Sequence, residues 1–228
     1  MSREAATPAV TLRPMARADA AWSADLHRRA LDVGLFPSLG PRFLRRYHRT
    51  FVESPFAVAL MADVDDVPAG FVLGILQPGP HRRETLRTHG TWLAVIGLCT
   101  ILVRPALLFR FARTRLRAYV RALWRHLRPN EVHERHDSTG GAAVLCHIAV
   151  EDSQRGLGLG KELVDALVGT AGAAGRRTVT TSTVDAASFY ESLGWTHITA
   201  GRTFDGEIQH RLTTTCAGYL DDRLRLQR

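Results

Sequence analysis

Apolar and polar residues recur along the chain with periods that predict both strands and helices. The segment from Val144 to Val150 is an almost continuous apolar run, which is typical of a strand buried on both faces. From Leu159 onward apolar residues recur three and four positions apart, which predicts an amphipathic helix that ends at Gly175. A glycine-rich turn joins the two elements. The glycines therefore lie at the N-terminus of a helix.

The same patterns predict further elements on both sides of this unit. Before it, we expect a strand at 10–14, helices over 17–31 and from Pro41, and two paired strands at 56–61 and 70–76. A break at 34–41 separates the two helices. After it, we expect a β-branched strand at 177–184, a short helix at 186–193, and strands at 195–200 and 209–215.

The turn from Arg155 to Gly160 has the features of an anion site. The first turn of a helix carries backbone N–H groups without internal partners and a partial positive charge, so phosphate binds there readily. Glycines let an anion approach closely, and Arg155 and Lys161 add full charges. In a dinucleotide loop the third glycine would stand at Lys161, and in a Walker loop a Ser or Thr would stand at Glu162, so neither motif fits. A plain tight connection between strand and helix is the alternative.

These residues resemble the acetyl-CoA-binding signature of the GNAT N-acetyltransferase superfamily, Gln/Arg-x-x-Gly-x-Gly/Ala between a strand and a helix. The segment from Thr183 to Trp195 resembles a second motif of the family, although Thr183 stands where the family usually has Asn. The resemblance implies an α/β GNAT fold, in which a mixed, mostly antiparallel sheet flanked by helices splays beside the 142–150 strand to admit acetyl-CoA. The implied coenzyme contacts are Ile148, Val150, Arg155, Gly156, Leu157, Gly158, Gly160, Lys161 and Thr183.

Acetyl transfer to an amine requires an unprotonated amine, a donor for the oxyanion and a proton for the departing thiolate. By resemblance, Tyr190 is the general acid for the thiolate, and a backbone N–H near Ile148 is the oxyanion donor. His147 lies in the central strand and titrates in the useful pH range, so it is our candidate for the base. A water chain or a carboxylate such as Asp32 is an alternative base. Both Tyr190 and His147 also fit a purely structural role in the core.

A basic segment at about 81–137 separates the third expected strand from the coenzyme-binding strand, and we expect a helical insertion here. Residues 81–128 hold eleven arginines and one acid, so this piece carries about +10 where the whole chain carries +8. The apolar run 92–103 is too short to span a bilayer, and Pro105 is expected to open a second helix. Four readings stay open for the arginines of 104–128: peripheral attachment to an anionic membrane, an anionic substrate, nucleic acid, or a solvated lid or oligomer contact. No nucleic-acid motif accompanies them, so we expect no nucleic-acid partner.

Length and composition complete these expectations. The 228 residues fit a single domain, 1–228, that contains the insertion. Three widely spaced cysteines argue against a disulfide framework, and the first residues contain no apolar signal region, so we expect a cytoplasmic protein. The pair His133 and His136 has no third ligand in view, so no metal is expected.

The predicted function is an N-acetyltransferase that moves an acetyl group from acetyl-CoA to a primary amine of a small acceptor. An amino sugar, nucleotide- or lipid-linked, is the leading acceptor because the insertion is cationic. By resemblance, the break at 35–39 would line the acceptor pocket. The alternatives are a protein or peptide N-acetyltransferase and a non-catalytic coenzyme A-binding module that attaches to membranes through the basic segment.

Overall fold

The computed structural model describes residues 8–31, 39–103, 141–202, 208–217 and 219. The strands are β1 (Val10–Pro14), β2 (Ala57–Val64), β3 (Val67–Ile75), β4 (Ala142–Val150), β5 (Thr178–Thr183), β6 (Thr196–Arg202) and β7 (Ile208–Thr215). The helices are α1 (Ala20–Ala30), α3 (Pro41–Glu53), α4 (Pro78–Val103), α7 (Leu159–Ala173) and α8 (Ala187–Ser192), with short 3-10 turns η1 (Arg17–Asp19) and η2 (Asp152–Gln154). The helix expected over 17–31 is thus divided into η1 and α1.

The strands form one seven-stranded sheet in the order β1-β2-β3-β4-β5-β7-β6. Every neighbouring pair is antiparallel except β4 and β5, so the predicted mixed, mostly antiparallel sheet is confirmed. The hairpin between β2 and β3 is tighter than expected, because only Asp65 and Asp66 separate the two strands. Both residues have positive φ, 49° and 63°, a conformation that aspartate tolerates better than most residues.

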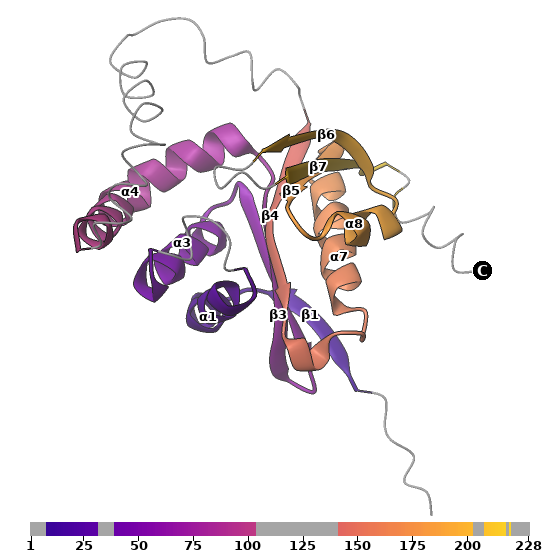
Figure 1. Ribbon diagram of the computed structural model, residues 1–228, viewed down its shortest axis with the longest axis horizontal. Coiled ribbons are helices and arrows are strands. Elements are labelled where there is room, and N and C mark those ends of the chain that lie inside the picture. The colour runs from indigo at the N-terminus through magenta and orange to yellow at the C-terminus, as the bar shows by residue number, and fades with distance from the viewer. Residues whose placement is uncertain (1–7, 32–38, 104–140, 203–207, 218, 220–228) are drawn as a thin grey trace, which may run out of the picture.

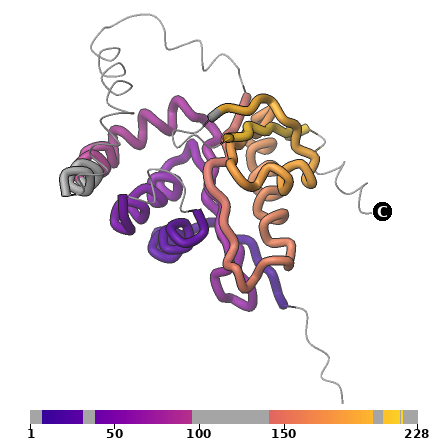
Figure 2. The backbone as a smooth tube through the Cα atoms, viewed as in Figure 1, coloured from indigo at the N-terminus to yellow at the C-terminus, as the bar shows by residue number. Residues whose placement is uncertain are grey.

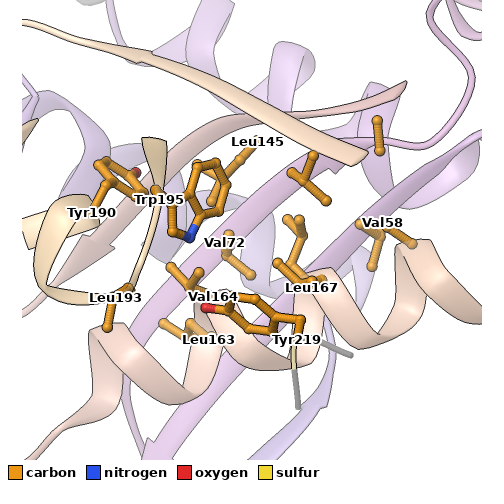
Figure 3. Close-up of a cluster of buried hydrophobic side chains, with 14 of the residues drawn as sticks. Val58, Val72, Leu145, Leu163, Val164, Leu167, Tyr190, Leu193, Trp195 and Tyr219 are labelled. Carbon is orange, nitrogen blue, oxygen red and sulfur yellow. The ribbon is translucent and has the colours of Figure 1, made fainter. Parts of the chain in front are cut away.

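Helices cover both faces of the sheet (Figures 1 and 2): α1, α3 and α4 lie on one face, and α7 and α8 lie on the other. The apolar stripe of α7 buries Leu163 and Leu167 against the strands, in a core that also contains Trp195 (Figure 3). On the opposite face, α1 and α3 bury Leu26 and Phe51 in a second core. Strand β4 lies between these two cores.

Strands β4 and β5 separate part-way along their length. Parallel pairing runs from Ala142 with Thr178 to Leu145 with Thr181, whereas β4 continues to Val150. The splay expected beside β4 is therefore present. The middle of β4 is only half buried, less than its apolar run predicts, because the strand has lost its neighbour on one edge.

The insertion between β3 and β4 begins with α4, which starts at Pro78 and includes the apolar run 92–103. Its remainder, with the helix predicted from Pro105 and the pair His133 and His136, lies outside the described residues. So do residues 32–38, which hold most of the expected acceptor loop. Among the helices of the described ranges, none combines the length and the apolar character needed to cross a membrane.

Candidate active site

A cleft of about 640 Å³ opens where β4 ends and α7 begins. It is bounded by the end of α1, the open half of β4, the glycine turn, the first residues of α7 and the start of α8. Seven of the predicted site residues line it: Ile148, Val150, Arg155, Gly156, Gly158, Gly160 and Lys161. The sequence motif and the cleft therefore coincide.

The glycine turn owes its shape to two left-handed residues. Gly156 has φ 87°, and Gly158, the N-cap of α7, has φ 80°. A Cβ atom at either position would meet no atom within 4 Å, so the backbone conformation and not crowding favours glycine here. This conformation opens the first turn of α7 toward the cleft, where N–H groups without helical partners are available to an anion.

Two cations flank the turn. The Lys161 ammonium lies 3.6 Å from the Asp165 carboxylate and is partly buried. The Arg155 guanidinium pairs with Asp152 at 2.8 Å, and both side chains are largely exposed. An exposed pair of this kind contributes little to stability, so Arg155 can exchange Asp152 for a ligand phosphate at small cost.

The opposite wall of the cleft is the open edge of β4. The Glu151 N–H donates to Ala69 O at 2.8 Å, and the antiparallel register pairs Val150 with Gly70 and Ile148 with Val72. Because hydrogen-bonded and non-bonded pairs alternate in such a ladder, Ile148 and Val150 direct their N–H and C=O groups away from β3. These groups face the splay, where an extended ligand chain can pair with them as a strand would.

Tyr190 lies in the core and does not line the cleft. Its side chain is 3 % exposed and packs against Phe189 and Trp195, with ring centroids 5.1 Å away in both cases. Figure 3 shows Tyr190 beside Trp195. Burial raises the pKa of Tyr190 to about 12, and a side-chain hydrogen bond with Thr181 offsets part of that rise. Thr181 belongs to the last β4–β5 pair before the strands separate, so the Tyr190 hydroxyl lies at the apex of the splay.

His147 does not line the cleft either, because its side chain faces the α1 and α3 layer. Its Nε2 atom lies 3.0 Å from the Tyr47 hydroxyl, and its ring centroid lies 4.5 Å from that of His27. Burial lowers the pKa of His147 to about 3, with a smaller contribution from His27. The imidazole is therefore neutral at physiological pH.

Leu157 and Thr183 are predicted coenzyme contacts that lie outside the cleft lining. Leu157 is 42 % exposed at the tip of the turn. The Thr183 hydroxyl accepts a hydrogen bond from the Ala186 N–H at 3.0 Å, so it stabilises the turn that precedes α8. Their predicted contact with the coenzyme stays a prediction.

Sequence reasoning missed several lining residues. Ala30 and Leu31 come from the end of α1, and no local motif marks them. Asp185, Ser188 and Phe189 also line the cleft, and they belong to the second motif, whose position could have indicated them. Within the described ranges no group of three or more His, Cys, Asp or Glu side chains is arranged to hold a metal ion.

Comparison with known proteins gives a match to one protein family over part of the chain. Residues 118–197 match the family model described as an acetyltransferase (GNAT) domain, and this range includes β4, the glycine turn, α7, β5 and α8. A comparison with curated proteins gives no match. The fold and the matched motif region together support the predicted resemblance to the GNAT acetyltransferase superfamily. The matched domain supports the predicted acyltransferase class and the predicted cosubstrate, acetyl-CoA.

Solved structures with the same fold extend over almost the whole chain. SsHAT is 20% identical, with a TM-score of 0.60, and the match covers 92% of this chain and 100% of that one. An aminoglycoside 6'-acetyltransferase type Ii is 16% identical, with a TM-score of 0.55 and coverage of 90% and 97%. YncA from Salmonella typhimurium, solved with its cofactor acetyl-CoA, is 13% identical, with a TM-score of 0.51 and coverage of 91% and 94%. At these identities the likeness establishes the fold.

Proposed function

We propose that this chain transfers an acetyl group from acetyl-CoA to a primary amine of a small acceptor. One observation carries the proposal: the left-handed turn at Gly158 opens the first turn of α7 into a cleft that is also lined by the part of β4 that has separated from β5. The pyrophosphate fits the N–H groups of this turn and the charge of Lys161. The pantetheine arm fits the open edge of β4 at Ile148 and Val150, which directs the thioester toward the apex of the splay.

Tyr190 is suited to assist the departing thiolate. Its hydroxyl lies at that apex beside Thr181, and it is protonated at neutral pH, as a phenol is even at its ordinary pKa. A thiolate, conjugate to a thiol with a pKa of about 8.5, accepts a hydrogen bond or a proton from such a donor as the carbon–sulfur bond breaks. The backbone N–H of Ile148 is the corresponding donor for the oxyanion.

An amino sugar that is linked to a nucleotide or a lipid is the acceptor that the charge distribution favours. Helix α4 places Arg82, Arg83 and Arg87 at exposed positions, and eight further arginines follow between residues 104 and 128. A protein or peptide acceptor would instead favour a neutral or acidic groove for its own basic groups. An aminoglycoside acetyltransferase among the structures of like fold is compatible with an amino-sugar acceptor.

Membrane attachment is a second candidate property, and α4 supplies the observation that favours it. Leu86, Trp92 and Val95 are each more than half exposed on this helix, beside the arginines. Apolar side chains among arginines suit the interface of an anionic leaflet. In this reading the protein is cytoplasmic and binds peripherally to the inner face of the membrane. If the chain binds coenzyme A but does not catalyse transfer, the same helix would attach it to the membrane.

The test is thiol release from acetyl-CoA with a panel of amines that includes free, nucleotide-linked and lipid-linked amino sugars and a peptide N-terminus. We expect amine-dependent release that is fastest with an amino sugar. Turnover only with peptides would show that the chain is a protein or peptide acetyltransferase and would refute a small amino-sugar acceptor. Binding of acetyl-CoA and of anionic vesicles with no turnover on any amine would support the non-catalytic module.

A further inference from the structure

A cluster of polar side chains is buried between α1, α3 and β4, inside a layer that is otherwise apolar. His48 and Ser23 are fully buried, and His27 is 2 % exposed. Tyr47 and His147 adjoin them, with the His27 and His48 rings 5.1 Å apart and the His27 and His147 rings 4.5 Å apart. Burying polar groups is unfavourable unless they are hydrogen-bonded to one another, so the cluster must be internally organised.

The hydrogen bonds between side chains of α1 and α3 define which atoms donate and which accept within this cluster. The Ser23 hydroxyl donates to Met15 Sδ at 3.8 Å, which leaves its oxygen to accept the His48 Nδ1–H at 2.9 Å. With its proton on Nδ1, His48 accepts through Nε2 from the His27 Nδ1–H, also at 2.9 Å. This assignment follows from the network. Each of the two rings thus carries one proton and is neutral.

A bulge in β4 turns His147 toward this cluster. Leu73 pairs with His147 and Gly74 with Leu145, so Cys146 has no partner on β3. The extra residue brings both Cys146 and His147 to the α1 and α3 side, whereas in a regular strand consecutive side chains alternate. Unlike His27 and His48, which are buried, His147 is a residue of intermediate exposure.

The cluster adjoins the inner end of the coenzyme cleft. Ile148 and Ala149, the residues after His147, line that cleft, and so does Ala30, which follows His27 by one helical turn. His147 also lies in the stretch of β4 that has separated from β5. A thioester at the apex of the splay would therefore lie close to His147, the least buried histidine of the cluster.

We propose that His147 accepts the proton released by the acceptor amine, and that Tyr47, His27 and His48 are positioning residues for its ring. The inference rests on the proposed function and deepens it. The amine nitrogen bonds to the thioester carbonyl carbon and the carbon–sulfur bond breaks. The nitrogen loses one proton to His147 Nδ1, and the thiolate gains one from Tyr190. In this arrangement the His147 Nε2–H donates to the Tyr47 oxygen, which leaves Nδ1 free.

Burial opposes a positive charge on His147, because it lowers the pKa of this imidazole to about 3, but the titratable groups around it add no fixed charge. The titratable groups that face it are His27 on α1, Tyr47 and His48 on α3, and Cys146 beside it on β4. Burial raises the pKa values of Tyr47 and Cys146, and it lowers those of the other two histidines, so all four are neutral. A neutral shell tolerates one transient charge on His147, whereas a second charged imidazole within 5 Å would repel it.

The test compares His147→Gln, Tyr47→Phe, His48→Leu and His48→Gln in the full chain, with His197→Gln, an exposed histidine paired with Glu191, as the matched control. We expect kcat to fall about a hundredfold in His147→Gln and about tenfold in Tyr47→Phe, with unchanged acetyl-CoA affinity. His48→Gln keeps an acceptor for His27 Nδ1–H and should recover the activity that His48→Leu loses. The control should keep wild-type kcat.

Nitrogen-15 NMR of the imidazoles gives a readout that does not depend on turnover. The proposal predicts the Nε2–H form of His147 in the wild-type chain and a mixture of both forms in Tyr47→Phe. A predominant Nδ1–H form in the wild-type chain, or a kcat within about twofold of wild type in His147→Gln, would overturn it. Absence of turnover on every amine would instead refute the proposed function. The NMR result would still decide which ring nitrogen of His147 carries the proton.

Discussion

The replacement Gly158→Glu tests where the pyrophosphate binds. A glutamate side chain at the N-cap of α7 would extend bulk and a negative charge toward the cleft at the position assigned to the anion. Gly158→Ala is the matched control, because both variants carry the same backbone strain at φ 80°, on the order of 1–2 kcal/mol in a left-handed conformation. The Cβ atom itself meets nothing within 4 Å, so the fold should survive in both variants.

The difference between the two variants isolates the charge and bulk of the carboxylate. Two unit charges 4 Å apart repel by about 1 kcal/mol in bulk water and about 4 kcal/mol at an effective dielectric constant of 20. The cleft is partly open, so we expect the dissociation constant of acetyl-CoA to rise between about fivefold and several hundredfold from Gly158→Ala to Gly158→Glu. Calorimetric titration measures this ratio, and thermal melts check folding. Equal affinity in two folded variants would refute the placement of the pyrophosphate at this turn.

Three further predictions concern the rest of the chain. Tyr190→Phe removes the hydroxyl at the apex of the splay and should lower kcat at least tenfold with acetyl-CoA affinity unchanged; thiol release and calorimetry check this, and an unchanged kcat would exclude the acid role. Burial lowers the pKa of His27 to about 4 from 6.5, so the unfolded chain binds a proton that the folded chain does not, and stability should fall as the pH drops through that window. Across this pH window the melting temperature of His27→Gln should change less with pH than that of the wild-type chain, and an identical slope of melting temperature against pH would contradict the linkage. Trp92→Ser should weaken sedimentation with anionic vesicles whereas Val67→Ser, exposed on β3, should not; equal binding of both variants would exclude α4 as the contact.

The strand, turn and helix from Ala142 to Ala173 could be predicted from the sequence because their determinants are local. The apolar run, the glycines and the helical period each specify their own segment, and the structure places the glycines at the N-terminus of α7. The hairpin of β2 and β3 is similarly local. The element boundaries differ by a few residues, since strand pairing extends β2 beyond its apolar run.

The histidine cluster illustrates what the sequence alone does not reveal. His27, His48 and His147 come from three elements, and their contact depends on the packing of α1 against α3 and on the bulge at Cys146. A bulge reverses which residues share a face of a strand, and the apolar run of β4 contains no sign of it. Ala30 and Leu31 line the cleft because α1 packs against the end of β4, which is also a tertiary contact. An ion pair between Arg29 and Glu151, 2.7 Å long, joins α1 to the residue after β4.

The most direct test of the central claim is mass analysis of the amine after incubation with acetyl-CoA and the full chain. The account predicts that an amino-sugar acceptor gains one acetyl group on its nitrogen, in step with thiol release. Stable binding of acetyl-CoA without acetylation of any amine in the panel would contradict it.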